Sequence, residues 1–267
     1  MANTAQPVGV FDSGVGGLTV VNKLRHLLPH EDIVYLGDTR RNPYGIRTRE
    51  EILSFTREII AFLAGQHVKL IAFACNTATA TAYDTVINET DIPLLGMSRG
   101  IKTAKDTTTE KRIAVFATPL TIANHIHKKE AEKTDPFLTI VEQPCASLAG
   151  LIERGKLDGP EIREAVRDDV APVLKARVDT AIFGCTHYPF VRHIFEELCG
   201  ESVVFVDPAH ETALQTLAVL KKKNLLNTQR RPGYLHLCFT AEAGRGAALA
   251  SELISPEEFT AAEVSLT

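Results

Sequence analysis

The sequence lacks the features of a membrane protein or a secreted protein. Nowhere does an apolar run reach the ~18 residues that a membrane span needs. The amino terminus has no positively charged segment followed by an apolar one, so we expect no signal peptide. A strongly basic face or tail is also missing, and the formal net charge is −4. These absences argue against a membrane, and against nucleic acid as the main partner.

Cysteine is sparse, and its spacing is irregular. The chain has five cysteines, an odd number, and none of them form a CxxC pair. No group of cysteines and histidines has zinc-finger spacing, which argues against a metal site. Free thiols of this kind are typical of a reducing cytoplasm, where we expect the protein to reside. The five are Cys75, Cys145, Cys185, Cys199 and Cys238.

Short apolar segments alternate with helical patterns along the chain, which is 45% hydrophobic and 23% charged. This alternation predicts an α/β fold with mostly parallel central sheets. Strands are expected at residues 8–11, 33–36, 69–74, 93–96, 112–116, 138–141, 180–183 and 202–206. Helices are expected at residues 17–28, 50–65 and 78–88.

Two pairs of segments from the two halves of the chain resemble each other. Residues 8–14 (VGVFDSG) resemble residues 113–119 (IAVFATP), and residues 70–77 (LIAFACNT) resemble residues 180–187 (TAIFGCTH). Each is an apolar strand pattern that leads into a hydroxyl or thiol residue and a turn. A chance likeness of short apolar runs is the alternative, but two related α/β units are the simplest explanation.

The same repeat suggests where the domains and the ligand lie. We expect residues 1–97, completed by 210–267, to form the first domain and residues 98–209 to form the second. In open α/β sheets, ligands bind beyond the carboxyl ends of the strands. The polar residues that follow the repeated strands would then lie at the functional ends of the two sheets.

Cys75 and Cys185 occupy corresponding places in the two halves, each after a strand and before a polar turn. Where such a turn opens a helix, its N–H groups and dipole stabilise a thiolate. His187, two residues beyond Cys185, could give or accept a proton, and Asp12 could do the same for Cys75. The other three cysteines are interpreted as small buried apolar residues, the commoner case.

Two equivalent thiols suit the inversion of a stereocentre through its α-proton. One group removes the proton from one face of the carbon, and the other delivers a proton to the opposite face. One cysteine must begin as thiolate and the other as thiol, and a modestly lowered pKa allows either state near neutral pH. The pattern therefore predicts a two-base racemase.

Two further motifs favour a small anionic substrate. Residues 12–17 (DSGVGG) do not fit the GxGxxG spacing of a dinucleotide loop, and no P-loop lysine follows. The glycines are better suited to bring backbone N–H groups close to a small anion, with Ser13 as a further donor. The turn at Pro43-Tyr44-Gly45 could contact substrate through its phenol and backbone, although a plain surface turn is the alternative.

Four motifs in order resemble the glutamate racemases of the aspartate/glutamate racemase superfamily. They are residues 12–20 (DSGVGGLTV), 35–45 (YLGDTRRNPYG), 75–78 (CNTA) and 184–189 (GCTHYP). The resemblance runs from about residue 8 to residue 209. It implies a two-domain α/β fold with the active site in the cleft between the domains, no pyridoxal phosphate, no other cofactor and no metal. It also implies an isomerase that supplies D-glutamate for peptidoglycan, and hence for cell wall biogenesis and cell shape, in the cytoplasm, and a possible homodimer.

The resemblance also implies roles for individual residues. Cys75 and Cys185 match the two proton donor/acceptors, and Asp12 and His187 match the auxiliary acid/base positions. The substrate-binding positions are matched by Ser13, Pro43, Tyr44, Gly45, Asn76, Thr77, Thr118, Thr121, Glu153 and Thr186. The chain departs from the family pattern at residues 96–100 (GMSRG) and 144–147 (PCAS). The alternatives are an aspartate racemase, a related thiol-dependent isomerase and a non-catalytic ligand-binding relative.

Overall fold

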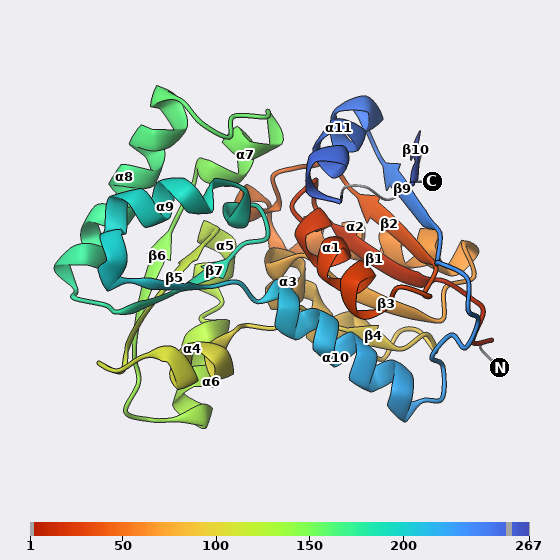
Figure 1. The fold of residues 1–267 in the computed structure, drawn as a ribbon, viewed down its shortest axis with the longest axis horizontal. Coiled ribbons are helices and arrows are strands. Elements are labelled where there is room, and N and C mark those ends of the chain that lie inside the picture. The colour runs from red at the N-terminus through yellow and green to blue at the C-terminus, as the bar shows by residue number, and fades with distance from the viewer. Residues whose placement is uncertain (1–2, 255–257, 267) are drawn as a thin grey trace. The chain divides into compact units, whose positions relative to one another are not determined.

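The computed structural model describes residues 3–254 and 258–266, which fold as two compact units (Figure 1). One unit contains the chain up to Met97 and from Ala209 onward, and the other contains Ser98–Pro208. Each unit contains a parallel β-sheet with helices on its faces, which confirms the predicted α/β class with two related parallel sheets. Within the described ranges, no helix is both long enough and apolar enough to span a membrane.

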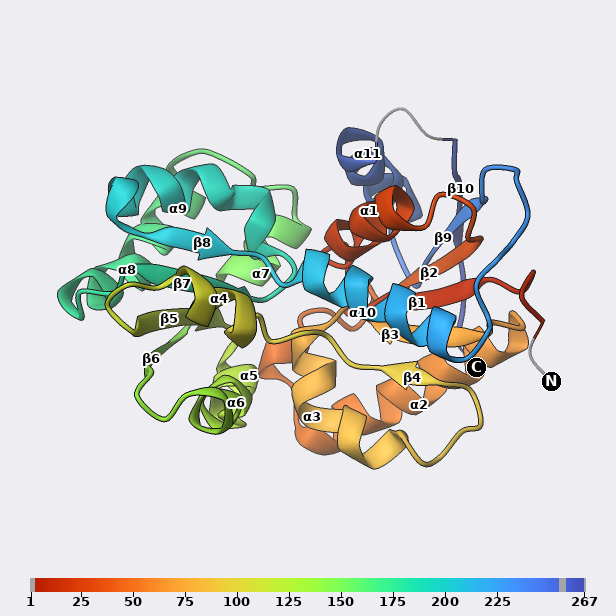
Figure 2. The same cartoon turned by 60° about the horizontal axis from the view of Figure 1, so that its bottom comes forward.

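The first unit has a six-stranded sheet in the order β10-β9-β2-β1-β3-β4, and every strand pair is parallel. Figure 2 shows α1 and α11 on one face of this sheet and α2 and α3 on the other. The strands are β1 (Val8–Asp12), β2 (Ile33–Gly37), β3 (Leu70–Phe73), β4 (Leu94–Leu95), β9 (Leu235–Phe239) and β10 (Thr260–Glu263). The helices are α1 (Leu18–Leu27), α2 (Arg49–Gly65), α3 (Asn76–Val86), α10 (Ala209–Lys222) and α11 (Ala243–Leu253), with a 3₁₀ turn η1 (Tyr44–Ile46).

The second unit has a four-stranded parallel sheet in the order β6-β5-β7-β8. Alternate residues of β5 point to opposite faces, so Phe116 packs in one apolar cluster and Val115 in another. The strands are β5 (Arg112–Ala117), β6 (Thr139–Pro144), β7 (Thr180–Gly184) and β8 (Val204–Val206). The helices are α4 (Ile101–Thr107), α5 (Pro119–Ala123), α6 (Ile126–Thr134), α7 (Leu148–Glu153), α8 (Pro160–Lys175) and α9 (Arg192–Cys199), with 3₁₀ turns η2 (Tyr188–Val191) and η3 (Gly200–Ser202).

The two sheets repeat one topology. The order β2-β1-β3-β4 in the first unit corresponds to β6-β5-β7-β8 in the second. In both sheets, the second strand lies on one side of the first strand, and the third and fourth strands lie on its other side. The strand order therefore reverses between β1 and β3 in the first unit and between β5 and β7 in the second. Such a switch point leaves a crevice at the carboxyl ends of the strands, where ligands of open α/β sheets bind. The repeat places Cys185 directly after β7, and Cys75 two residues beyond the end of the corresponding strand β3.

Two strands were not predicted, and one helix begins earlier than predicted. The predicted strands are all present with slightly different ends, but β9 and β10 were missed. The edge strand β10 is largely exposed, and only its pairing with β9 makes it a strand, so its sequence carries no apolar signal. Helix α3 begins at Asn76 rather than residue 78, because the side chain of Cys75 caps it.

Candidate active site

Cys75 lies at the junction of β3 and α3. The N–H of Ala74 donates to the carbonyl of Phe11 at 2.8 Å, which fixes the end of β3 beside β1. Cys75 is the N-cap of α3, and its Sγ accepts a hydrogen bond from the N–H of Ala78 at 3.4 Å. Only 3% of the residue is exposed. The thiol is therefore held at a helix N-terminus, at the carboxyl edge of the sheet.

Asp12 is the last residue of the neighbouring strand, β1, and Ser13 follows it. The carboxylate of Asp12 accepts a hydrogen bond from the N–H of Gly17 at 2.7 Å, and the hydroxyl of Ser13 lies 3.4 Å from its other oxygen. A Cβ atom at position 17 would lie 2.7 Å from the Cβ of Asp12 and 2.9 Å from the hydroxyl of Tyr35. Only glycine lets the backbone come this close to the carboxylate.

The proton state of Cys75 differs from the prediction. Burial raises the pKa of its thiol well above the usual range, and the nearby negative charge of Asp12 raises it further. Hydrogen bonds from the backbone N–H groups of Ala78 and Ser13 lower it, but by less. The prediction of a stabilised thiolate at this helix N-terminus is therefore wrong for the free protein, because desolvation outweighs the helix end.

The turn at Pro43-Tyr44-Gly45 forms η1, and the peptide bond between Asn42 and Pro43 is cis. Tyr44 is 1% exposed, and its hydroxyl donates to Asp38 at 2.5 Å. Burial and the charge of Asp38 together raise the pKa of this phenol. The phenol is thus engaged by Asp38, and the backbone of the turn is a second group of this motif that could meet a substrate.

Asn76 and Thr77 occupy the first turn of α3, and both are buried. The amide nitrogen of Asn76 has no hydrogen-bond partner among the described residues. A buried amide N–H without a partner costs roughly 1–3 kcal/mol, so a ligand that accepts this bond gains affinity. Asn76 thus offers a free donor one residue away from Cys75.

Cys185, His187 and Glu153 form a chain of contacts in the second unit. The Sγ of Cys185 lies 3.6 Å from Nδ1 of His187, and Nε2 of His187 lies 2.7 Å from the carboxylate of Glu153 at the end of α7. A carboxylate can only accept, so Nε2 donates to it and Nδ1 faces the sulfur. Burial by itself lowers the pKa of His187, but its interactions with Cys185 and then Glu153 raise it well above the usual range.

Three threonines complete the predicted set in the second unit. Thr118 is the N-cap of α5, and its hydroxyl lies 3.0 Å from the hydroxyl of Thr121. Thr186 follows Cys185 directly and is 4% exposed. The turn after Cys185 leads into the 3₁₀ turn η2 rather than into an α-helix. All three lie at or just beyond the carboxyl ends of β5 and β7.

The structure thus gathers the predicted residues into two half-sites, one in each unit. The first half-site contains Asp12, Ser13, Pro43, Tyr44, Gly45, Cys75, Asn76 and Thr77, and the second contains Thr118, Thr121, Glu153, Cys185, Thr186 and His187. In each, a cysteine lies beside its own acid/base partner. Asp38 and Asn42 of the first half-site were missed as functional candidates, although Asp38 stands directly after β2 at the same edge of the sheet.

The remaining cysteines are free and buried. Burial raises the pKa of Cys199 and of Cys238 to about 11, so both stay protonated thiols near neutral pH. Burial and the nearby Asp169 raise the pKa of Cys145 as well. Among the described residues, no group of three or more His, Cys, Asp and Glu side chains could hold a metal ion.

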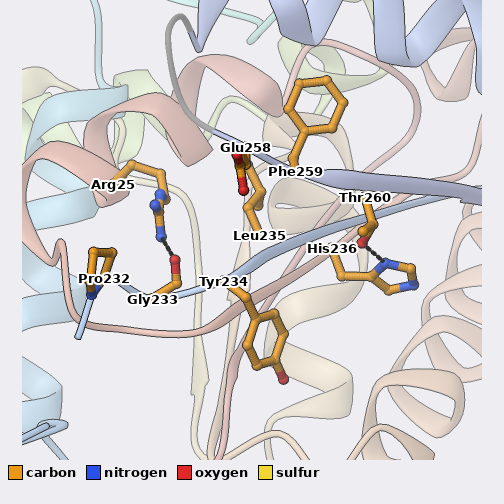
Figure 3. A pocket seen from close by; sticks show the side chains of 9 residues that line it. All are labelled: Arg25, Pro232, Gly233, Tyr234, Leu235, His236, Glu258, Phe259 and Thr260. Carbon is orange, nitrogen blue, oxygen red and sulfur yellow. Dashed lines mark hydrogen bonds between the residues drawn. The ribbon is translucent and has the colours of Figure 1, made fainter.

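A hollow on the first unit lies away from these residues (Figure 3). Arg25 at the end of α1 donates to the carbonyl of Gly233 at 2.8 Å there, and His236 lies 2.6 Å from the hydroxyl of Thr260. Since His236 and Thr260 stand at the amino ends of β9 and β10, the hollow is at the opposite edge of the sheet from Cys75. It is not part of the half-site.

Known proteins resemble the chain over nearly its whole length. The family model described as Asp/Glu/Hydantoin racemase matches residues 17–216. The glutamate racemase of Lactobacillus helveticus is 38% identical over 260 residues, covering 97% of each chain. The crystal structure of a glutamate racemase from Bacillus anthracis is similar, with a TM-score of 0.92 and 31% identity over 99% of each chain. The glutamate racemase of Francisella tularensis, solved with D-glutamate, has a TM-score of 0.88 and 30% identity over 98% of each chain.

Proposed function

Since the chain belongs to the glutamate racemases of the Asp/Glu/Hydantoin racemase family, we propose that it interconverts L- and D-glutamate by proton transfer through Cys75 and Cys185. The observation that carries this mechanism is the repeated placement of the two thiols. Each follows the corresponding strand of a repeated sheet, and each lies beside its own acid/base group, Asp12 or His187. Inversion at the α-carbon requires removal of a proton from one face and delivery to the other, which two such groups can perform.

The proton states of the two half-sites support complementary starting roles. Cys75 begins as the thiol, because burial and Asp12 raise its pKa. The raised pKa of His187 favours an imidazolium, and its Nδ1 lies 3.6 Å from the sulfur of Cys185. In one direction the Cys185 thiolate takes the α-proton and Cys75 delivers its own. In the other direction, Asp12 accepts the proton of Cys75 as that thiol becomes the base, and His187 gives Cys185 the proton that Cys185 delivers to the opposite face.

Several donors support binding of a substrate carboxylate. The unpartnered amide of Asn76 lies at the N-terminus of α3, where backbone N–H groups favour an anion. The Tyr44-Gly45 backbone and the hydroxyl of Thr186 stand at the same edges of their sheets as the cysteines. Glutamate is the substrate that the structure of the F. tularensis relative, solved with D-glutamate, supports. The product D-glutamate would enter peptidoglycan synthesis.

Serine variants of the two cysteines test this function. Cys75→Ser and Cys185→Ser should each lower racemisation of glutamate at least about a hundredfold in both directions, because a general acid/base contributes 10²–10⁴-fold. Circular dichroism of either pure enantiomer measures the rate. Cys199→Ser, which changes a buried thiol outside both half-sites, should keep the activity. Near-normal turnover by either variant of Cys75 or Cys185 would refute the two-base assignment, and no turnover of glutamate by the unmodified protein would refute the function itself.

A further inference from the structure

We propose that Asn42 is a positioning residue that directs the hydroxyl of Ser13 toward Asp12 and thereby sets the geometry of proton transfer at Cys75. This role rests on the proposed function. Neither the internal repeat nor the turn at Pro43-Tyr44-Gly45 pointed to Asn42 as a functional residue. Asn42 is partly buried beside the half-site and extends the chain of contacts that ends at Cys75.

The hydrogen bonds of Asn42 have a defined direction. Its Nδ2 lies 3.2 Å from the carbonyl oxygen of Ser13 and 3.3 Å from the Ser13 hydroxyl. A carbonyl oxygen can only accept, so the amide nitrogen, and not the amide oxygen, must face it. The same nitrogen therefore donates to the Ser13 hydroxyl oxygen as well. The Asn42 amide cannot take a proton from Ser13 in this orientation.

The bond from Asn42 fixes where the hydroxyl proton of Ser13 points. A hydroxyl has one proton, and with its oxygen already accepting from Asn42 that proton is free to donate elsewhere. The Asp12 carboxylate lies 3.4 Å away and accepts it. Asp12 in turn interacts with the thiol of Cys75. The relay therefore runs from Asn42 through Ser13 and Asp12 to Cys75.

Hydrogen bonds of the residues around Asn42 hold its backbone in place, and this fixes the position of its side-chain amide. Arg41 donates to the buried carboxylate of Asp38 at 2.6 Å, and Tyr44 donates to the same carboxylate at 2.5 Å. The N–H of Asp38 donates to the carbonyl of Asp12 at 2.9 Å. Residues on both sides of Asn42 are thus tied to one buried anion, which is itself tied to the strand that carries Asp12.

The relay serves one half of the reaction. Cys185 has a separate chain of contacts through His187 to Glu153, in the other unit. Loss of the Asn42 donor should therefore slow proton transfer at Cys75 and leave proton transfer at Cys185 unchanged. Since L- and D-glutamate have equal free energies, kcat/KM must fall equally in both directions, so this ratio alone does not identify the slowed step.

Primary isotope effects do identify it. Asn42→Leu removes the donor and keeps the branched shape, and Asn42→Ala provides a second variant if leucine disturbs the fold. We expect kcat/KM to fall by about three- to tenfold, the effect of one lost hydrogen bond. With α-deuterated glutamate, the isotope effect on kcat/KM should rise for the enantiomer that Cys75 deprotonates. For the other enantiomer it should fall, because delivery from Cys75 then limits the rate.

Two control variants make the result unambiguous. Cys75→Ser in heavy water identifies the enantiomer that Cys75 serves, because only the other one still exchanges its α-proton. Glu153→Gln, on the Cys185 side, should shift both isotope effects in the opposite sense. Isotope effects that stay unchanged or move together in the folded Asn42 variants would overturn the positioning role. If the unmodified protein does not racemise glutamate, the proposed function fails instead, and the two failures are distinct.

Discussion

Cys75 and His127 are both buried, and burial moves their pKa values in opposite directions. It raises the pKa of the Cys75 thiol, and it lowers the pKa of His127 to about 3, with a smaller contribution from the charge of Arg99. In both cases the neutral form is favoured, because low dielectric disfavours charge. Neither ring nitrogen of His127 has a hydrogen-bond partner among the described residues. Under the proposed mechanism, burial keeps on the Cys75 thiol the proton that it delivers to the substrate.

His127 predicts a measurable loss of stability in acid. Its folded-state pKa of about 3 lies below the ordinary value of 6.5, so the unfolded chain binds the proton more readily. The contribution of neutral His127 to the free energy of unfolding is complete above pH 6.5. It is lost as the pH falls toward 3, by up to about 1.4 kcal/mol per pH unit. His127→Leu should remove this slope from urea-unfolding curves, whereas His193→Gln, at an exposed histidine, should not. Equal slopes in the His127 variant and the unmodified protein would contradict the prediction.

At the scale of elements, an ion pair joins the amino ends of two strands of the first sheet. Lys69 precedes β3 and Glu31 precedes β2, and their charged atoms lie 2.5 Å apart with both side chains almost completely buried. Lys69 also donates to the carbonyl of Thr4, and Glu31 accepts from the N–H of Asn227 at 2.6 Å. The pair therefore ties the amino terminus and a late segment to the edge of the sheet opposite the cysteines.

Removal of one partner should destabilise the first unit strongly. Lys69→Met leaves a buried uncompensated carboxylate, and breaking such a pair costs about 3–5 kcal/mol of unfolding free energy. Adding Glu31→Gln should restore part of this loss, because glutamine carries no charge and still accepts from Asn227. Arg57→Met, which breaks the exposed pair with Glu89, should have only a slight effect in the same urea titration. A Lys69 variant as stable as the Arg57 variant would be incompatible with this explanation.

At the scale of the whole molecule, the sequence predicted the repeated sheets and most residues of both half-sites, because the motifs are local. The four motifs follow strand ends, and the structure places their residues there. The sequence did not predict the contacts that join distant segments. Thr240, for example, follows the carboxyl end of β9 and donates a hydrogen bond of 2.9 Å to Asp38. The strand β9 itself was not predicted. Such contacts depend on tertiary packing. The raised pKa of Cys75 depends on it too, because burial of the thiol outweighs the hydrogen bonds at the helix N-terminus.

One measurement tests the exchange of protons between two bases most directly. L-Glutamate is incubated with the protein in heavy water, and both enantiomers are separated and weighed by mass spectrometry early in the reaction. With Cys75 and Cys185 acting on opposite faces, the D-glutamate formed should carry one solvent deuterium at the α-carbon, while the remaining L-glutamate stays largely undeuterated. D-Glutamate that keeps its original α-proton would show that a single base moves the proton, and would contradict the two-cysteine mechanism.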